Sequence, residues 1–127
     1  MIKRLSVATL CLILSSVAQA DVAYSGHYAT CMEEAGGVTM KMIECIGAEY
    51  EAQDARLNGA YQALRDGLPT ERRQSLLEAQ RLWIDYRDAN CRFYATAGGT
   101  LARVAANQCM LRETAERADE LEAGRRF

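Results

Sequence analysis

The chain has 127 residues, of which 50% are hydrophobic and 25% charged, and its formal net charge is -2. This length fits a single domain, and a composition with 1 proline, 9 glycines and no low-complexity run excludes a disordered or fibrous chain. The weak negative charge excludes the basic surface of a nucleic-acid-binding protein, and the single histidine excludes most multi-histidine metal sites. We therefore expect one globular domain with no cofactor, no metal and no nucleic-acid partner.

Residues 1–20 have the pattern of a secretory signal peptide. Two basic residues precede an apolar run over residues 5–17, and residues 18–20 (Ala-Gln-Ala) form a small-x-small cleavage site. The run is too short for a comfortable bilayer span, and no second hydrophobic segment follows. We therefore expect cleavage after residue 20, a helical domain over residues 21–127 without an integral membrane segment, and a periplasmic or secreted location. Cleavage removes 2 of the 15 basic side chains and none of the 17 acidic ones, which leaves a formal charge of -4.

Four cysteines remain after the predicted cleavage: Cys31, Cys45, Cys91 and Cys109. An even number of cysteines in an oxidising compartment is typical of structural disulfides, and the C-x-x-C spacing of metal and redox sites is absent. Four cysteines permit three pairings. The first two lie symmetrically about residue 38 and the last two about residue 100, so hairpin geometry favours pairing within each set. The other pairings would clamp the N-terminal segment onto a later helix, and peptide mapping would distinguish them.

Three groups of helix-breaking residues divide the mature chain. They are Gly36-Gly37, Gly67-Leu68-Pro69-Thr70 and Gly98-Gly99-Thr100. Between them, apolar residues recur at spacings of three and four, and no strand-like alternation competes with this pattern. We predict helices over residues 40–66, 70–96 and 100–122, with a short helix over residues 28–34. The predicted fold is all-α, a small disulfide-stapled bundle of three long helices with a short N-terminal helical segment.

Polar side chains interrupt the apolar stripe of each long helix. Asp54 does so in the first, with Asn58 one turn later; Gln80 and Arg87 do so in the second, and Thr114 in the third. A buried charge costs several kcal/mol unless it is paired, so an inward-facing Asp54 needs a partner such as Arg87. We predict that these five residues form a polar core network that fixes the helix register. In the alternative, they reach solvent and line a pocket wall or a partner-contact patch.

An ordered set of motifs resembles a known protein family. The matching pieces are Glu44-Cys45, Asp54 with Leu57-Asn58 and Tyr61-x-x-Leu64, Ala79-Gln80-Arg81-x-Trp83, Tyr86-Arg87-Asp88-x-x-Cys91, Gly98-Gly99-Thr100, Cys109 and Thr114-x-x-Arg117-x-x-x-Leu121. Together they resemble the N-terminal domain of the LprI-type lysozyme inhibitors, formerly a domain of unknown function. The resemblance covers nearly all of the chain from Cys31 onward. It implies an exported, disulfide-stapled helical domain whose protein partner is a lysozyme of the c-type or another class.

Inhibition by such a domain would proceed by occlusion of the muramidase cleft, in which two carboxylates carry out hydrolysis. A basic or hydrogen-bonding group would suit those carboxylates. The candidates for this contact are Arg72, Arg73 and Arg81 in the second long helix, or the loop Gly36-Gly37-Val38-Thr39. Electrostatic steering of a basic enzyme is assigned to Glu33, Glu34, Glu49 and Glu51. The alternative is that these charges form an ordinary solvated face.

Two other classes of function compete with inhibition. An enzyme is disfavoured, because His27 has no evident nucleophile and because Asp85 and Asp88 have arginines at ion-pairing distances along the helix. The second class is a periplasmic envelope adaptor or structural module without lysozyme activity. Aromatic side chains outside the main stripes would anchor its partner, and they are Tyr24, Tyr28, Phe93 and Phe127.

Overall fold

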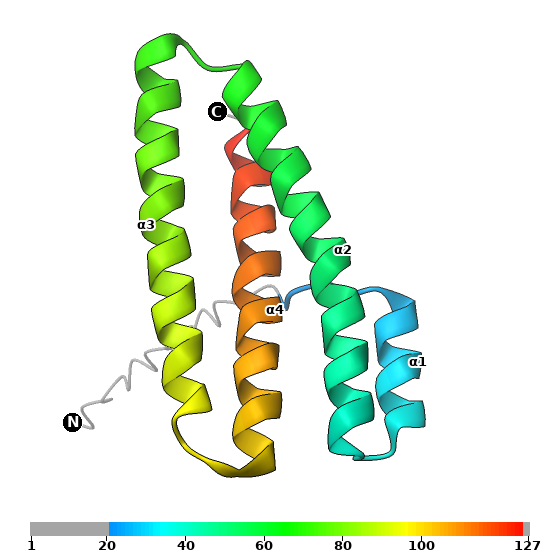
Figure 1. The fold of residues 1–127 in the computed structure, drawn as a ribbon. Helices are drawn as coiled ribbons and strands as arrows, with labels where there is room; N and C mark the ends of the chain where they lie inside the picture. The colour runs from blue at the N-terminus through cyan, green and yellow to red at the C-terminus, as the bar shows by residue number, and fades with distance from the viewer. Residues whose placement is uncertain (1–20, 126–127) are drawn as a thin grey trace, which may run out of the picture.

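The computed structural model describes residues 21–125, which form four helices and no strand. These are α1 (Gly26–Ala35), α2 (Thr39–Asp66), α3 (Thr70–Ala95) and α4 (Gly99–Gly124), shown in Figure 1. The predicted all-α fold with three long helices and a short N-terminal one is confirmed. The predicted signal peptide (residues 1–20) and Phe127 lie outside the described residues.

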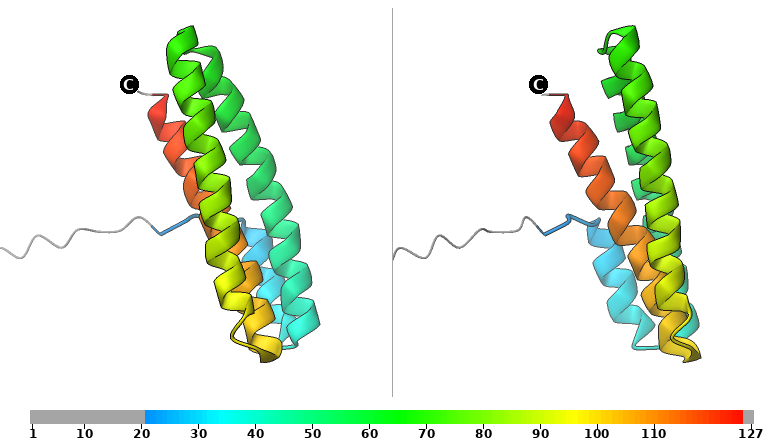
Figure 2. Two further views of the ribbon diagram at one scale, coloured as in Figure 1. Left: turned by 60° about the vertical axis from the view of Figure 1, so that its left-hand side comes forward. Right: turned by 90° about the vertical axis from the view of Figure 1, so that its left-hand side faces the viewer.

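Glycine pairs form the turns that separate α1 from α2 and α3 from α4. Gly36 and Gly37 have φ angles of 55° and 80°, and Gly98 and Gly99 both have φ of 78°. This left-handed backbone region is strained for residues with a Cβ atom, which explains why glycine stands at these turns. Both turns lie at one end of the molecule, and the α2–α3 turn lies at the other (Figures 1 and 2).

Helix α4 is the central element of the fold. It packs against both α2 and α3, whereas α1 packs against α2 (Figure 1). The hydrophobic core lies mainly between α2 and α4, where Leu57 and Ala60 meet Ala118 and Leu121. Helix α3 contributes less to this core, because Gln80 and Cys91 are its only buried residues.

Two disulfides connect helices that follow one another in the chain. Cys31–Cys45 joins α1 to α2, and Cys91–Cys109 joins α3 to α4, which is the pairing that hairpin geometry favours. The bridged residues are 14 and 18 positions apart, and closures of this length stabilise a fold by on the order of 3 kcal/mol each. Among residues 21–125, no helix is both long and apolar enough to cross a bilayer.

Candidate functional site

Trp83 lies between two guanidinium groups where α3 packs on α4. The guanidinium carbon of Arg87 is 4.9 Å from the centre of the Trp83 ring, and that of Arg117 is 5.9 Å away. Arg117 donates a hydrogen bond from Nε to Oε1 of Gln80 (3.0 Å), and Arg87 donates to Oγ1 of Thr114 (3.4 Å). Cation–π contacts of this kind stabilise packing most where water is excluded. The structure therefore brings Gln80, Arg87 and Thr114 together at the α3–α4 contact.

Asp54 and Asn58 lie apart from this cluster. Asp54 accepts a hydrogen bond from Nδ2 of Asn58 (3.1 Å), and Arg87 pairs with its neighbour Asp88 (2.9 Å). The predicted Asp54–Arg87 pair required direct packing of α2 on α3, whereas α4 lies between these helices (Figure 1). Because Asp54 is half-buried and Asn58 exposed, water can solvate the carboxylate and no inward-facing partner is needed.

The three arginines suggested for partner binding have different surroundings. Arg73 donates from Nε to the carbonyl of Leu68 (2.7 Å) and from Nη2 to the carbonyl of Asp66 (3.4 Å). It thus satisfies carbonyl groups at the end of α2 and in the following turn. Arg72 and Arg81 are exposed on α3. These two side chains, rather than Arg73, are available to contact a partner.

The turn between α1 and α2 forms a closed projection, which we call the α1–α2 tip (residues 36–41). The Cys31–Cys45 bridge joins its two arms. Within the turn, the backbone N–H of Val38 donates to the carbonyl of Ala35 (2.9 Å). The tip can adopt few conformations, because the disulfide, the backbone hydrogen bond and the helix on either side all restrict it.

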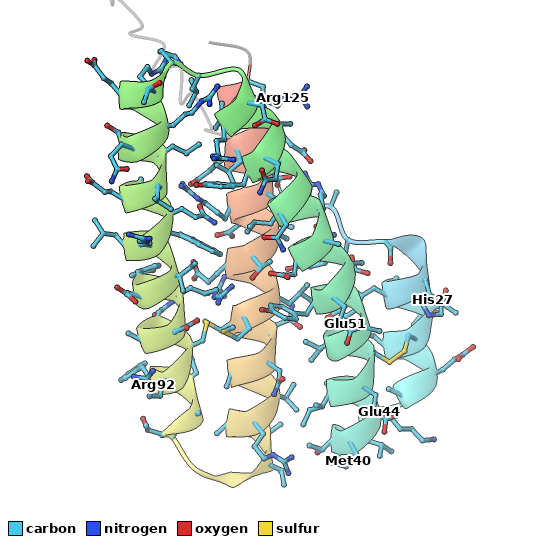
Figure 3. All side chains as sticks on the ribbon, turned by 45° about the horizontal axis from the view of Figure 1, so that its top comes forward. His27, Met40, Glu44, Glu51, Arg92 and Arg125 are labelled. Carbon is cyan, nitrogen blue, oxygen red and sulfur yellow. A yellow bond between two sulfur atoms is a disulfide. The ribbon has the colours of Figure 1, made fainter. Side chains whose placement is uncertain are left out.

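The α1–α2 tip presents apolar side chains and one cation to solvent. Val38 is 50% exposed and Met40 is 52% exposed, and Figure 3 places Met40 at the start of α2, at the end of the molecule. Exposed Lys41 follows; it is the sole lysine in residues 21–127. Lys41 lines a shallow hollow of about 260 Å³ together with Glu34 and Glu44.

Glu49 anchors the segment before α1 to helix α2. Its Oε1 accepts hydrogen bonds from the backbone N–H of Ser25 (3.0 Å) and from Nε2 of Gln53 (2.9 Å), and its Oε2 accepts from the Ser25 hydroxyl (2.5 Å). Burial opposes ionisation, but the hydrogen bonds from Ser25 and Gln53, with a smaller contribution from His27, outweigh it and lower the pKa of Glu49. At 4% exposed, Glu49 cannot act as the steering charge suggested from the sequence. The remaining acidic candidates are exposed, and they are Glu33, Glu34 and Glu51.

Two of the aromatic side chains considered as partner anchors are engaged within the molecule. The rings of Tyr24 and Tyr28 pack edge to face with centres 5.2 Å apart, and the Tyr28 hydroxyl donates to Oε1 of Gln108 (2.8 Å). Burial raises the pKa of both tyrosines above the ordinary value. Phe93, in contrast, is 71% exposed at the end of α3.

The histidine considered for catalysis lies on a different helix from the two aspartates. His27 is exposed on α1 (Figure 3), whereas Asp85 is exposed on α3 and Asp88 is held by Arg87. Across residues 21–125, no three histidine, cysteine, aspartate or glutamate side chains gather closely enough to hold a metal ion.

Comparison with known proteins places the chain in a family. A family model described as lysozyme inhibitor LprI matches residues 31–121. The chain belongs to this LprI family. An uncharacterized protein of Rhizobium meliloti (strain 1021) is 27% identical to it over 97 residues, which are 65% of this chain and 70% of that protein. No solved structure matches the chain significantly.

The region matched by the LprI family contains most of the features described above. It begins at Cys31 and therefore includes both disulfides, the α1–α2 tip and the group of side chains around Trp83, which we call the Trp83 cluster (Gln80, Trp83, Arg87, Thr114 and Arg117). The segment before α1, with Ser25, lies outside it. In this LprI-family protein, the matched region therefore includes the exposed α1–α2 tip and the exposed residues of α3, among them Arg72 and Arg81.

Proposed function

We propose that this LprI-family protein is an exported inhibitor that binds a lysozyme and blocks its muramidase cleft with the α1–α2 tip. Membership of a family of lysozyme inhibitors supports the activity. The pattern of residues 1–20 and the two disulfides support export. The observation that favours the α1–α2 tip is its combination of a closed, disulfide-linked turn with exposed Val38 and Met40.

A constrained tip is well suited to insertion into a cleft. Because the disulfide already restricts the turn, binding fixes few additional bond rotations. Less conformational entropy is lost, so more of the contact free energy contributes to affinity. Val38 and Met40 supply apolar surface to bury. The Lys41 ammonium, next along the chain, supplies positive charge for the two carboxylates of a muramidase cleft.

Charge around the tip suits a basic partner. Exposed Glu33 and Glu34 lie on α1, directly before the turn, and the chain is negative overall. Such charges increase the association rate more than the final affinity, and salt screens them. We therefore assign affinity to the tip and steering to the carboxylates of α1.

Turnover of a cell-wall substrate by a basic c-type lysozyme, measured with the oxidised protein at low and physiological salt, tests the proposal. We expect inhibition that persists at physiological salt. Replacing two of the tip residues, Val38→Asp with Lys41→Glu, should raise the inhibition constant at least about tenfold, since about 1.4 kcal/mol of lost binding free energy has this effect.

The turn between α3 and α4 provides a matched control, because it is also disulfide-linked and also contains two glycines. Leu101→Asp at this turn, where Leu101 is 78% exposed, should leave the inhibition constant unchanged. The assignment to the α1–α2 tip would be contradicted if the inhibition constant rose equally in both variants, or if it did not rise in the Val38/Lys41 variant. Absence of inhibition at both salt concentrations would favour the envelope adaptor, for which exposed Phe93 is the available aromatic anchor.

A further inference from the structure

Helix α3 carries a second stripe, made of small and large, mostly apolar residues, which no other part of the described chain covers. The residues of this α3 stripe follow one another at alternating spacings of four and three, and they are Ser75, Ala79, Leu82, Tyr86, Ala89 and Phe93. All six are exposed, and the large ones are far from buried: Leu82 is 70%, Tyr86 57% and Phe93 71% exposed. Helix α4 covers a neighbouring face of α3, through Trp83 and Gln80.

The spacing of the α3 stripe is that of a helix which pairs with another helix. Residues repeating at three and four form the seam of a two-stranded coiled coil, and the stripe continues over almost three heptads. Isolated exposed apolar residues are normal on a protein surface, whereas a continuous row of them marks an interaction surface. We propose that the α3 stripe packs against the α3 stripe of a second copy of this chain, with the two helices antiparallel.

The charges beside the α3 stripe favour a second copy in the antiparallel direction. Four charged residues follow one edge of the stripe at intervals of seven, and they are Glu71, Glu78, Asp85 and Arg92. All four are exposed, the first three are acidic and the last is basic. Arg92 lies at the flank of α3, where it also lines a hollow with Ala106 and Met110 of α4. An antiparallel copy brings the basic end of this edge to the acidic end of the other, and vice versa.

A parallel pair lacks this match. In a parallel coiled coil, the charged edge of one helix faces the opposite edge of its partner. On α3 that opposite edge contains Leu76 and Trp83, which are packed in the core with α2 and α4. The charged edge would therefore meet a surface that is already covered, and it would find no complementary charge there.

One antiparallel register aligns the whole stripe. When the two helices cross at the level of Ile84, each position of one stripe meets a position of the other. A large residue then faces a small one at each end, and two large side chains meet on either side of the centre. The resulting pairs, each formed twice, are Phe93 with Ser75, Ala89 with Ala79 and Tyr86 with Leu82.

The same register places Glu78 of each copy near Arg92 of the other copy. At the two-fold axis, Asp85 of one copy lies near Asp85 of the other. Two opposite-charge contacts thus accompany one like-charge contact. The six large apolar side chains of the two copies would bury somewhat less than about 1,000 Å² in total, which is close to the lower limit of a specific interface and suits a reversible dimer.

Sedimentation equilibrium of the oxidised protein tests the pairing. We expect a reversible dimer whose dissociation constant rises at least about a hundredfold in Tyr86→Glu, because each copy would bury an unpaired charge at the centre of the interface. Tyr86 is exposed in the monomer, so the helical circular dichroism spectrum should stay unchanged. Leu101→Glu, at a position outside the stripe that is more exposed than Tyr86 (78% against 57%), should leave the dimer intact. A monomeric wild-type protein, or a Tyr86→Glu variant that still dimerises, would overturn the proposal.

Charge exchange tests the direction of pairing. Arg92→Glu should weaken the dimer about five- to tenfold, since it places two acidic pairs across the interface. Adding Glu78→Arg in the same chain should restore the affinity, because both contacts then form with the charges reversed. The antiparallel register is wrong if the double variant loses as much dimerisation free energy as the two single variants lose together. These variants leave the α1–α2 tip unchanged, so dimerisation and lysozyme inhibition can fail separately.

Discussion

The two disulfide-linked hairpins of the molecule have turns of the same sequence but different surroundings. Each has an Ala-Gly-Gly sequence, at residues 35–37 and 97–99, with glycines in the left-handed region. In the α3–α4 hairpin both arms are long helices, and Cys91 and Cys109 are buried. In the α1–α2 hairpin one arm is a 10-residue helix, and Cys31 is half-buried.

This difference shows that the effect of a disulfide depends on the packing around it. The Cys91–Cys109 bridge lies in a contact that the Trp83 cluster already holds together. Helix α1 packs mainly against α2, and an isolated helix of its length is unstable in water. We therefore expect the bridge at Cys91 to stabilise the whole fold and the bridge at Cys31 to stabilise α1 and the α1–α2 tip.

The largest effect is expected on the α3–α4 hairpin. Replacing its cysteines, Cys91→Ala with Cys109→Ala, should lower the free energy of unfolding by about 3 kcal/mol, because the unfolded chain gains freedom. Urea denaturation followed by circular dichroism measures this change. A loss below about 1 kcal/mol would mean that the α3–α4 packing alone carries the stability of this hairpin.

A smaller global effect is expected from Cys31→Ala with Cys45→Ala. Amide hydrogen exchange should accelerate in α1, while amides of α2, α3 and α4 keep their protection, since local opening of α1 leaves the core intact. The urea midpoint should move by less than half as much as in the α3–α4 variant. Equal midpoint shifts would remove the distinction between the two hairpins.

The smallest effect concerns the Glu49 contact and is confined to acid. Because the pKa of Glu49 is lowered in the folded state, its contribution to stability is complete above its ordinary pKa of 4.5 and is lost as the pH falls through the lower folded value. Below about pH 4.5, amides near Ser25 should exchange faster relative to their intrinsic rates. Glu49→Gln should flatten this pH dependence, and amides of the α3–α4 hairpin should not follow it. The same acid response at both hairpins would argue against a local role for Glu49.

The helix boundaries and the disulfides were predictable because local rules determine them. Glycine pairs and Pro69 terminate helices wherever the chain packs, so the breaks at Gly36, Gly67 and Gly98 were readable in the sequence. Cysteines at equal distances from a helical turn become neighbours once the two arms lie antiparallel. Neither argument requires knowledge of which helices pack together.

The polar contacts were less predictable because they depend on the order of the helices in space. The Asp54–Arg87 pair fails since α4 separates α2 from α3, and no local pattern reveals that order. The sequence contains a weak indication that Glu49 is buried. Cys45, Glu49 and Gln53 are four residues apart and share one face of α2, a spacing that indicates an inward position for Glu49. Its partner Ser25 lies 24 residues away and could not be inferred.

The central position of α4 has a consequence for the order of events during biosynthesis. Ribosomes make the chain from its first residue, so the helix on which both α2 and α3 pack is made after both of them. Before residues 99–124 emerge, Leu57 and Ala60 lack their partners Ala118 and Leu121, so the core between α2 and α4 cannot form. We therefore expect a chain that ends before α4 to lack stable tertiary structure, because the surface of α2 that α4 covers stays in contact with water.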